Sequence, residues 1–172
     1  MSTPGTSIAQ PLTEAERAAI SGWLAGSLNR PQEAWNQWKD GSIATLAMGR
    51  RFSAVRLSEP LVYAVTASKL PDTVTRVLAS ALHGPVIHDP QGRRFYALTS
   101  PAVPTWGLGR HAEYLGLGTY LGVPRIEIIT PGEELGGYWA VPMARPGDLC
   151  DPIRLAAMVT AGSLELRAGA DS

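Results

Sequence analysis

The sequence predicts an α+β fold in which helices cover a mostly antiparallel sheet. Of its 172 residues, 45% are hydrophobic, which is typical of one globular domain with a sizeable core. The 18 glycines and 14 prolines are too many for a helical bundle and favour short strands joined by turns. Along the chain, the hydrophobic spacing passes from a helical period to a strand period and back. We therefore expect helices at the start, in the middle and at the end of the chain, covering one face of the sheet.

The first segment is predicted to be a disordered tail followed by a helix. Residues 1–11 are rich in Ser, Thr, Pro and Gly, as disordered chain ends often are. Thr13 and Glu16 have the spacing of a capping box, in which each side chain satisfies a backbone N–H of the first helical turn. We expect an amphipathic helix over residues 13–27.

A second helix completes an N-terminal helical pair. Pro31 suits the first turn of this helix, and Gly41 suits its end. Trp35 and Trp38 lie three residues apart and should share one side, while Trp23 lies on the preceding helix. We interpret the tryptophans as packing groups, with a stacking platform for a ligand as the alternative.

Short strands with a helical insertion follow this pair. Residues 43–48 and 52–57 are prone to β-structure, and the glycine and two arginines between them are compatible with a hairpin. Prolines then begin two helical stretches, over about 60–68 and 71–84.

The rest of the chain predicts more strands and a closing helix. Residues 85–88 and 94–99 flank the turn sequence Asp-Pro-Gln-Gly, which is a strong hairpin signal. We expect two short strands within 113–123, another strand at 138–141, and a helix that Asp151 caps.

These elements predict one α+β domain over residues 12–165 and a flexible C-terminal tail over 166–172. The chain lacks a signal-peptide pattern and a membrane-length apolar run, so we expect a cytoplasmic location without membrane association. The single cysteine, Cys150, cannot form an internal disulfide framework, and we expect it to be a buried, inert thiol.

The net charge of zero hides an uneven distribution. Residues 50–125 hold nine bases and four acids, a net charge of +5, whereas residues 1–49 carry −1 and residues 126–172 carry −4. A basic middle segment can hold an anionic partner. The alternative is a solvated surface on which these charges compensate one another in three dimensions.

Motifs for metal, covalent or phosphate-loop chemistry are not found. His83, His88 and His111 lack the close spacing of a zinc site, and each is interpreted as structural. The chain has no nucleophile elbow, no phosphate-binding glycine loop, and no strand-borne pair of acids for two-metal catalysis. We therefore predict no catalytic residue, no metal site and no cofactor.

What remains is a set of arginines and tyrosines next to predicted strands. Such a set can bind phosphates by charge-assisted hydrogen bonds and stack on bases. Edge-strand charges that protect against aggregation are the alternative interpretation. The candidate binding residues are Arg50, Arg51, Arg56, Arg93, Arg94, Arg110, Tyr96, Tyr114 and Tyr120.

Three segments carry a family resemblance: ATLAMGRRFSAVRL, GPVIHDPQGRRFYALTSP, and EYLGLGTYLGVPRI with GGYWAVP. They are similar to the opening strands, the middle hairpin and the glycine-rich closing strands of the bifunctional DNA primase/polymerase domain. This domain belongs to the archaeo-eukaryotic primase superfamily and occurs in plasmid, phage and actinobacterial proteins. The resemblance covers residues 41–162 and implies a primase-like sheet that binds nucleotides and nucleic acid.

The chain departs from this family at the positions of the catalytic groups. The family's acidic pair would fall within residues 53–57, which contain Arg56 and no acid, and its nucleotide-binding histidine would fall near Arg93 or Arg94. Glu113 alone corresponds to an acid of the family, and one carboxylate cannot assemble a two-metal site. The resemblance therefore implies a degenerate, inactive copy that still binds phosphates, since this affinity needs bases and not acids.

Our leading expectation is a catalytically inactive accessory protein that binds single-stranded nucleic acid or nucleotides through an arginine-rich sheet face. The alternative is a protein–protein adaptor or regulator that uses Trp23, Trp35 and Trp38 of the N-terminal helices, since aromatic residues are favoured interface anchors. A third possibility is an active nucleotidyltransferase that uses Glu113 together with Asp89.

Overall fold

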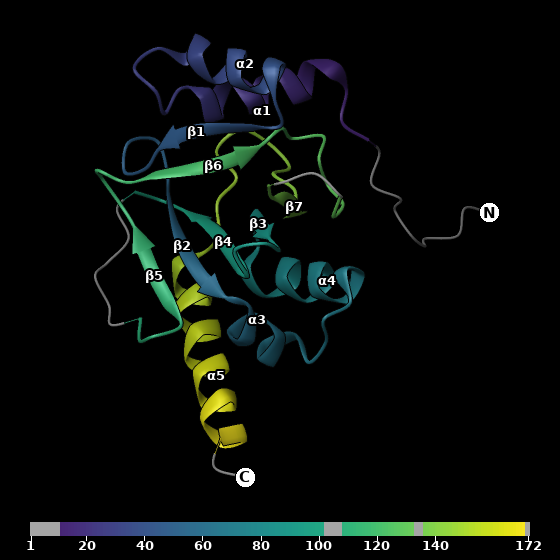
Figure 1. Ribbon diagram of the computed structural model, residues 1–172, viewed down its shortest axis with the longest axis vertical. Coiled ribbons are helices and arrows are strands. Elements are labelled where there is room, and N and C mark those ends of the chain that lie inside the picture. Colours follow the sequence, from purple (N-terminus) through teal and green to yellow (C-terminus); the bar gives the residue numbers. More distant parts are fainter. Residues whose placement is uncertain (1–10, 102–107, 133–135, 171–172) are drawn as a thin grey trace, which may run out of the picture.

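The computed structural model describes residues 11–101, 108–132 and 136–170, which form an α+β fold with the expected N-terminal helical pair (Figure 1). The tail expected over residues 1–11 lies outside the described residues, apart from its last residue. In chain order, the elements are α1 (Glu14–Ala25), α2 (Pro31–Asp40), β1 (Ile43–Ala47), β2 (Ser53–Ser58), α3 (Glu59–Thr66), α4 (Pro71–Leu82), β3 (Val86–Asp89), β4 (Arg94–Thr99), β5 (Ala112–Leu115), β6 (Tyr120–Pro124), β7 (Tyr138–Val141) and α5 (Pro152–Ala170).

The strands form two antiparallel sheets. The larger sheet has the strand order β5-β2-β4-β3-β7, and the smaller sheet pairs β1 with β6. The hairpin predicted around the Asp-Pro-Gln-Gly turn is confirmed as β3 and β4. The hairpin considered for β1 and β2 is wrong, because β2 pairs with β4 and β5 instead. The strand β1 pairs instead with β6, where Leu46 lies opposite Leu121, and both leucines belong to the same core cluster.

Local signals explain where the helices begin. The Thr13 side chain accepts a hydrogen bond from the backbone N–H of Glu16, and the Asp151 carboxylate accepts from the N–H of Ile153. Prolines occupy the first turn of α2 and α4, where their missing N–H costs nothing. The last helix, α5, extends to Ala170, beyond the boundary at residue 165 where we expected a tail to begin.

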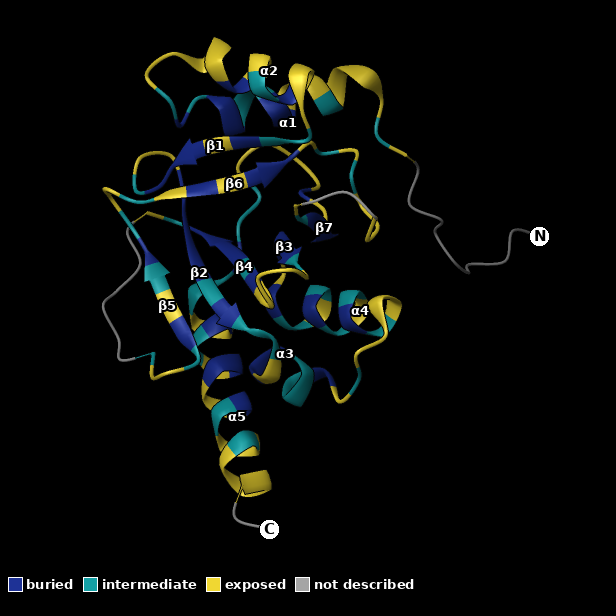
Figure 2. Ribbon diagram, in the orientation of Figure 1, coloured by how far each residue is buried: buried dark blue, intermediate teal, exposed yellow. Residues whose placement is uncertain are grey.

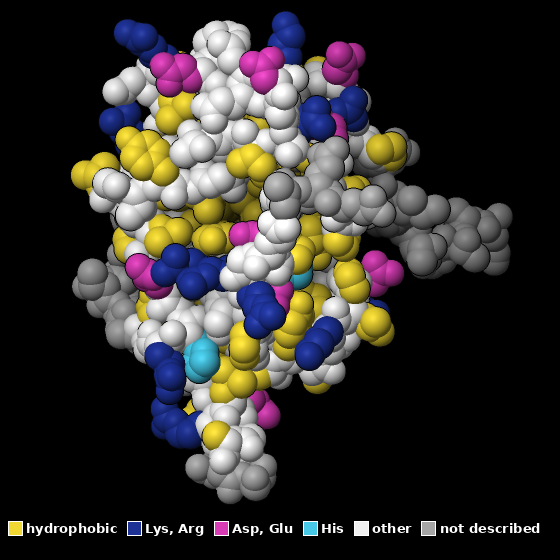
Figure 3. Space-filling view, viewed as in Figure 1, with side chains coloured by type: hydrophobic (Ala, Val, Ile, Leu, Met, Phe, Trp, Pro, Cys, Tyr) yellow, Lys and Arg dark blue, Asp and Glu magenta, His cyan; other side chains and the backbone are white. Residues whose placement is uncertain are grey.

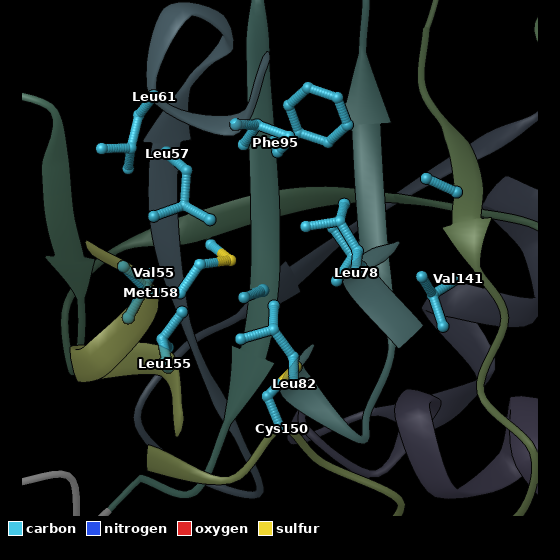
Figure 4. Packing of buried hydrophobic residues seen from close by; sticks show 14 of the residues in the cluster. Val55, Leu57, Leu61, Leu78, Leu82, Phe95, Val141, Cys150, Leu155 and Met158 are labelled. Carbon is cyan, nitrogen blue, oxygen red and sulfur yellow. The ribbon is translucent and has the colours of Figure 1, made fainter. Parts of the chain in front are cut away.

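The first core lies between one face of the larger sheet and helices α3, α4 and α5 (Figure 4). Val55 and Leu57 of β2 point into it, toward Leu155 and Met158 of α5. Cys150 lies in the same cluster, where burial raises the pKa of its thiol. Each fully buried leucine stabilises the fold by about 1.5–3 kcal/mol, so this core fixes the sheet against its helices.

The second core lies on the opposite face of the larger sheet. Leu24 of α1, Leu46 of β1 and Phe52 pack there with Leu98 and Trp139 of the larger sheet. The strands β1 and β6 run across the upper end of the larger sheet, between it and α1 and α2 (Figures 1 and 2). The strands β1 and β6 and the helices α1 and α2 cover only part of this face of the larger sheet. Polar side chains can therefore lie on the rest of the face.

Two glycines allow close approaches that this arrangement needs. Gly49 follows β1 at φ +85°, and a Cβ there would lie 2.4 Å from the backbone nitrogen of Leu117. Gly84 precedes β3, and its Cβ would lie 2.3 Å from the backbone nitrogen of Cys150. A side chain at either position would displace a neighbouring segment of backbone.

Candidate functional site

The alternation of side chains along β2 places two polar groups on the uncovered part of the sheet. Val55 points into the first core, so Arg56 and Ser58 lie on the other face. The antiparallel register puts Arg56 opposite Tyr96 of β4 and Glu113 of β5. A guanidinium, a phenol and a carboxylate therefore share one row of the sheet.

This part of the sheet borders a hollow of about 280 Å³, which we call the arginine pocket. It lies where β2, the start of β4 and the start of β5 meet, and Figure 3 shows Lys and Arg side chains with histidine over the lower half of this side of the molecule. Four of the six predicted arginines line it. The lining residues are Arg56, Ser58, Gly92, Arg93, Arg94, Arg110, His111, Ala112 and Glu113.

The four arginines of the pocket differ in their partners. Arg56 forms an ion pair with Glu113, and the two side chains are 32% and 58% exposed. Arg93, Arg94 and Arg110 are exposed and form no ion pair with the residues that the structure describes. An exposed ion pair contributes little to stability, so Glu113 mainly cancels the charge of Arg56. Three uncompensated positive charges remain in the pocket.

The backbone of Arg93 has an unusual conformation. Its φ is +56°, in the left-handed region that an L-residue rarely adopts. Its backbone N–H donates to the carbonyl oxygen of Pro90, and its carbonyl oxygen accepts from the N–H of Glu59. The side chain forms no hydrogen bond with the described residues. A glycine would meet the backbone requirement at lower cost, so the structure offers no folding reason for an arginine here.

Ser58 and His111 add hydrogen-bonding groups to the pocket. Ser58 Oγ lies 3.0 Å from His111 Nδ1, and it also accepts a bond from the N–H of Leu61 as the N-cap of α3. The hydroxyl can donate to Nδ1 when Nε2 carries the imidazole proton. His111 Nε2–H is then a further donor for an anion. The sequence analysis interpreted this histidine as structural, and no local pattern in the sequence links it to Ser58.

The other predicted binding residues lie elsewhere. The Arg50 guanidinium donates to Asn29, and this arginine lines a separate hollow together with Tyr120. The Arg51 guanidinium donates to the carbonyl oxygen of Trp23 and lies 5.8 Å from the centre of its ring. Arg51 therefore holds the segment between β1 and β2 against α1.

The three tyrosines also separate. Tyr96 lies beside Arg56 on the pocket face, and burial raises its pKa. Tyr114 aligns with Val55 and packs against the first core, on the other face of the sheet. Its hydroxyl donates to the carbonyl oxygen of Pro101 and also lies within hydrogen-bond distance of Ser53 Oγ, at 3.0 Å each. Only Tyr96 is therefore placed to meet a ligand of the arginine pocket.

The tryptophans of the helical pair contribute to packing. Trp38 is buried, and its indole N–H donates to the carbonyl oxygen of Val123 at 3.0 Å. Trp23 stacks on Phe52 with ring centres 5.6 Å apart. Trp35 meets the Trp38 ring edge-on and is the most exposed of the three, at 36%. The predicted side-by-side placement of Trp35 and Trp38 is confirmed.

The acids of the third hypothesis do not meet. Glu113 contacts Arg56, whereas the Asp89 carboxylate accepts a hydrogen bond from the N–H of Gly92 within the β3–β4 turn. Within residues 11–101, 108–132 and 136–170, no group of three or more His, Cys, Asp or Glu side chains could hold a metal ion.

A buried polar chain on the other face of the sheet was not predicted. His88 Nδ1 lies 2.8 Å from the Tyr138 hydroxyl, and Nε2 lies 2.7 Å from Glu59 Oε2. The ring stacks on Phe95 at 3.9 Å. Burial lowers the pKa of His88 despite the nearby carboxylate, and it raises the pKa of Tyr138 to about 12. A neutral imidazole satisfies both neighbours, accepting from the phenol and donating to the carboxylate. Glu59 is the first residue of α3, so these hydrogen bonds fix the start of this helix next to Ser58.

Comparison with known proteins adds no further information about this site. No family model, curated protein or solved structure matches this chain. Among the described residues, no helix has both the length and the hydropathy needed to cross a membrane. The geometry of the arginine pocket is therefore the basis for a functional proposal.

Proposed function

We propose that the protein binds the phosphate groups of single-stranded nucleic acid or of nucleotides in the arginine pocket, as an accessory protein without catalytic activity. The observation that carries this proposal is the meeting of Arg93, Arg94 and Arg110, none of them ion-paired with a described residue, around Ser58 and His111. Arginines from two separate chain segments converge on one hollow. Guanidinium groups suit phosphate because their planar N–H groups match two oxygens at once.

The sequence resemblance to primase/polymerase domains supports the same ligand class. The family's nucleotide-binding histidine would fall near Arg93 or Arg94, and both of these arginines line the arginine pocket. The resemblance also predicts an inactive site, because Arg56 stands where an acid is expected. The ion pair between Arg56 and Glu113 is consistent with that prediction, since it occupies the one carboxylate available.

The composition of the pocket predicts how it binds. Phosphate contacts carry little sequence information, and Tyr96 adds one aromatic side chain beside Arg56. We expect affinity that depends little on base sequence and falls steeply with salt. Non-specific binding of this kind has dissociation constants of about 1–100 μM at physiological salt.

The test is a fluorescence anisotropy titration of labelled single-stranded DNA at low salt. We expect saturable binding by the wild-type protein and weaker binding by Arg94→Ala. Arg76→Ala removes an exposed arginine of α4 outside the pocket, so it should bind like the wild type. No binding at tens of micromolar, or equal losses in both variants, would contradict the proposal.

The competing hypotheses have separate tests. An active nucleotidyltransferase would incorporate labelled nucleotides in the presence of Mg²⁺ or Mn²⁺, and we expect no incorporation. The protein-adaptor hypothesis stays a prediction from the sequence. Trp23 and Trp38 contribute to internal packing, which leaves Trp35 as the most exposed of its three tryptophans. The cytoplasmic location also stays a prediction.

A further inference from the structure

A second hollow adjoins the arginine pocket. It has a volume of about 300 Å³ and lies between the start of β5 and the C-terminal half of α5; we call it the helix groove. Arg110 and His111 line both hollows, so the two lie side by side. The residues that line the helix groove are Gly109, Arg110, His111, Ser163, Leu166, Arg167 and Ala170.

One face of α5 forms the wall of this groove. Ser163, Leu166, Arg167 and Ala170 have the spacing i, i+3, i+4, i+7, which places their side chains on one side of a helix. Leu166 packs against the first core and holds this side toward the domain. The last turns of α5 extend beyond the sheet (Figure 1), so the groove leads away from the arginine pocket along the helix.

Arg167 gives the helix groove a charge of its own. It is exposed and forms no ion pair with any residue that the structure describes. Glu165 is two residues away, which turns its side chain to the opposite side of the helix. Arginines without an ion-pair partner among the described residues therefore lie at the β3–β4 turn, between the two hollows, and on α5.

We propose that the ligand is a strand rather than a single nucleotide, and that its successive phosphates run from the arginine pocket past Arg110 to Arg167. The inference rests on the proposed function and adds its substrate class. The phosphates of one nucleotide can all lie in the arginine pocket. A row of arginine side chains that continues into a second hollow can be used only by a ligand with further phosphates. Arg110 and His111 lie at the junction and contact the strand between the two ends.

Two probes separate a strand from a nucleotide. The first is a labelled thymidine octanucleotide, and the second is thymidine triphosphate, measured by its displacement of the octanucleotide. Arg167→Ala should weaken octanucleotide binding about two- to fivefold, the effect of one exposed charge pair. It should also reduce the slope of log affinity against log salt by about 0.7, the contribution of one phosphate contact on a single strand. The dissociation constant of thymidine triphosphate should not change.

A matched control and a second variant make the test specific. Arg154→Ala removes an exposed arginine from the other end of α5, so both probes should bind as they do to the wild type. Ala170→Glu places a negative charge in the helix groove and should weaken the octanucleotide alone. Circular dichroism should show the wild-type helix content in all three variants.

The results separate this inference from the proposed function. If Arg94→Ala weakens both probes while Arg167→Ala and Ala170→Glu bind the octanucleotide like the wild type, the strand inference is overturned and the proposed function stands. Equal affinity for a dinucleotide and the octanucleotide would also overturn it. If neither probe binds the wild-type protein, both proposals fail.

Discussion

The backbone of Arg93 permits a substitution that separates binding from folding. Arg93 has a φ of +56° in the arginine pocket, and its side chain forms no hydrogen bond or ion pair with the described residues. We predict that Arg93→Gly weakens nucleic-acid binding without destabilising the protein. Both backbone hydrogen bonds of this residue, with Pro90 and Glu59, are kept in the variant.

The magnitude follows from the backbone conformation. The left-handed region costs an L-residue about 1–2 kcal/mol, and glycine avoids this cost. Glycine also raises the conformational entropy of the unfolded chain, and this lowers the gain in stability by about 0.4–1 kcal/mol. The free energy of unfolding should therefore rise by about 0–1.5 kcal/mol. For a chain of this length, the melting temperature should rise by up to about 5 °C.

Binding should change in the opposite direction. Loss of one guanidinium should weaken the affinity for single-stranded DNA about two- to fivefold and reduce its salt slope by about 0.7. Ala67→Gly and His83→Gly are matched controls, because both residues have positive φ and neither lines the arginine pocket. They should show the same effect on stability and no effect on binding.

The assays are thermal unfolding followed by circular dichroism, and anisotropy titrations at several salt concentrations. Wild-type affinity and salt slope in Arg93→Gly would refute the assignment of this arginine to the binding site. A clear loss of stability in Arg93→Gly, with none in the two controls, would refute the backbone argument and show that the side chain supports the fold.

Three further predictions test other parts of the structure. Burial lowers the pKa of His88 below its ordinary 6.5, so the unfolded chain takes up a proton that the native state resists; stability should be highest above pH 6.5 and fall as the pH drops toward the lowered value. Urea unfolding should show a smaller difference between about pH 7.5 and about pH 5 in His88→Gln than in the wild type, and an unchanged difference would contradict the role of this group. Glu113→Gln frees Arg56 from its ion pair, so single-stranded DNA should bind about two- to fivefold more tightly in the anisotropy assay, and weaker binding would show that the carboxylate assists the ligand. Gly84→Ala forces a Cβ to within 2.3 Å of the Cys150 backbone and should destabilise the protein by about 1–3 kcal/mol in urea, whereas Gly22→Ala, in the open helix α1, should stabilise it; equal effects would contradict the close approach.

The local elements could be predicted because their signals lie within a few residues of one another. Thr13 with Glu16, the helix-starting prolines, and the Asp-Pro-Gln-Gly turn each act through nearby backbone groups. The end of α5 was missed because Ala168, Gly169 and Ala170 have the composition of a flexible tail. In the structure, Gly162 lies against Leu61 of α3, and α5 continues past it to Ala170. Such a contact joins distant parts of the chain and leaves no local pattern.

The candidate site could be predicted only as a set of residues. The sequence named Arg56, Arg93, Arg94 and Arg110 together with Arg50 and Arg51, and nothing within the sequence separated the four from the two. Both Tyr96 and Tyr114 were predicted from the sequence to bind the ligand, although the register places them on opposite faces of the sheet. His111 could not be linked to Ser58, because their contact joins the residue before β5 to the end of β2 across 53 positions of the chain.

The sequence by itself determined which segments become helices and strands and which part of the chain is basic, because periodicity, caps and charge counts are local quantities. The tertiary structure alone decided that β1 pairs with β6, that β2 lies between β4 and β5, and that four arginines therefore meet at one hollow. Strand pairing depends on which apolar faces become buried together, and a slip of one residue would turn every side chain to the other face. The register of β2 thus places Arg56 beside Glu113 on the open face, whereas its neighbour Val55 lies in the core.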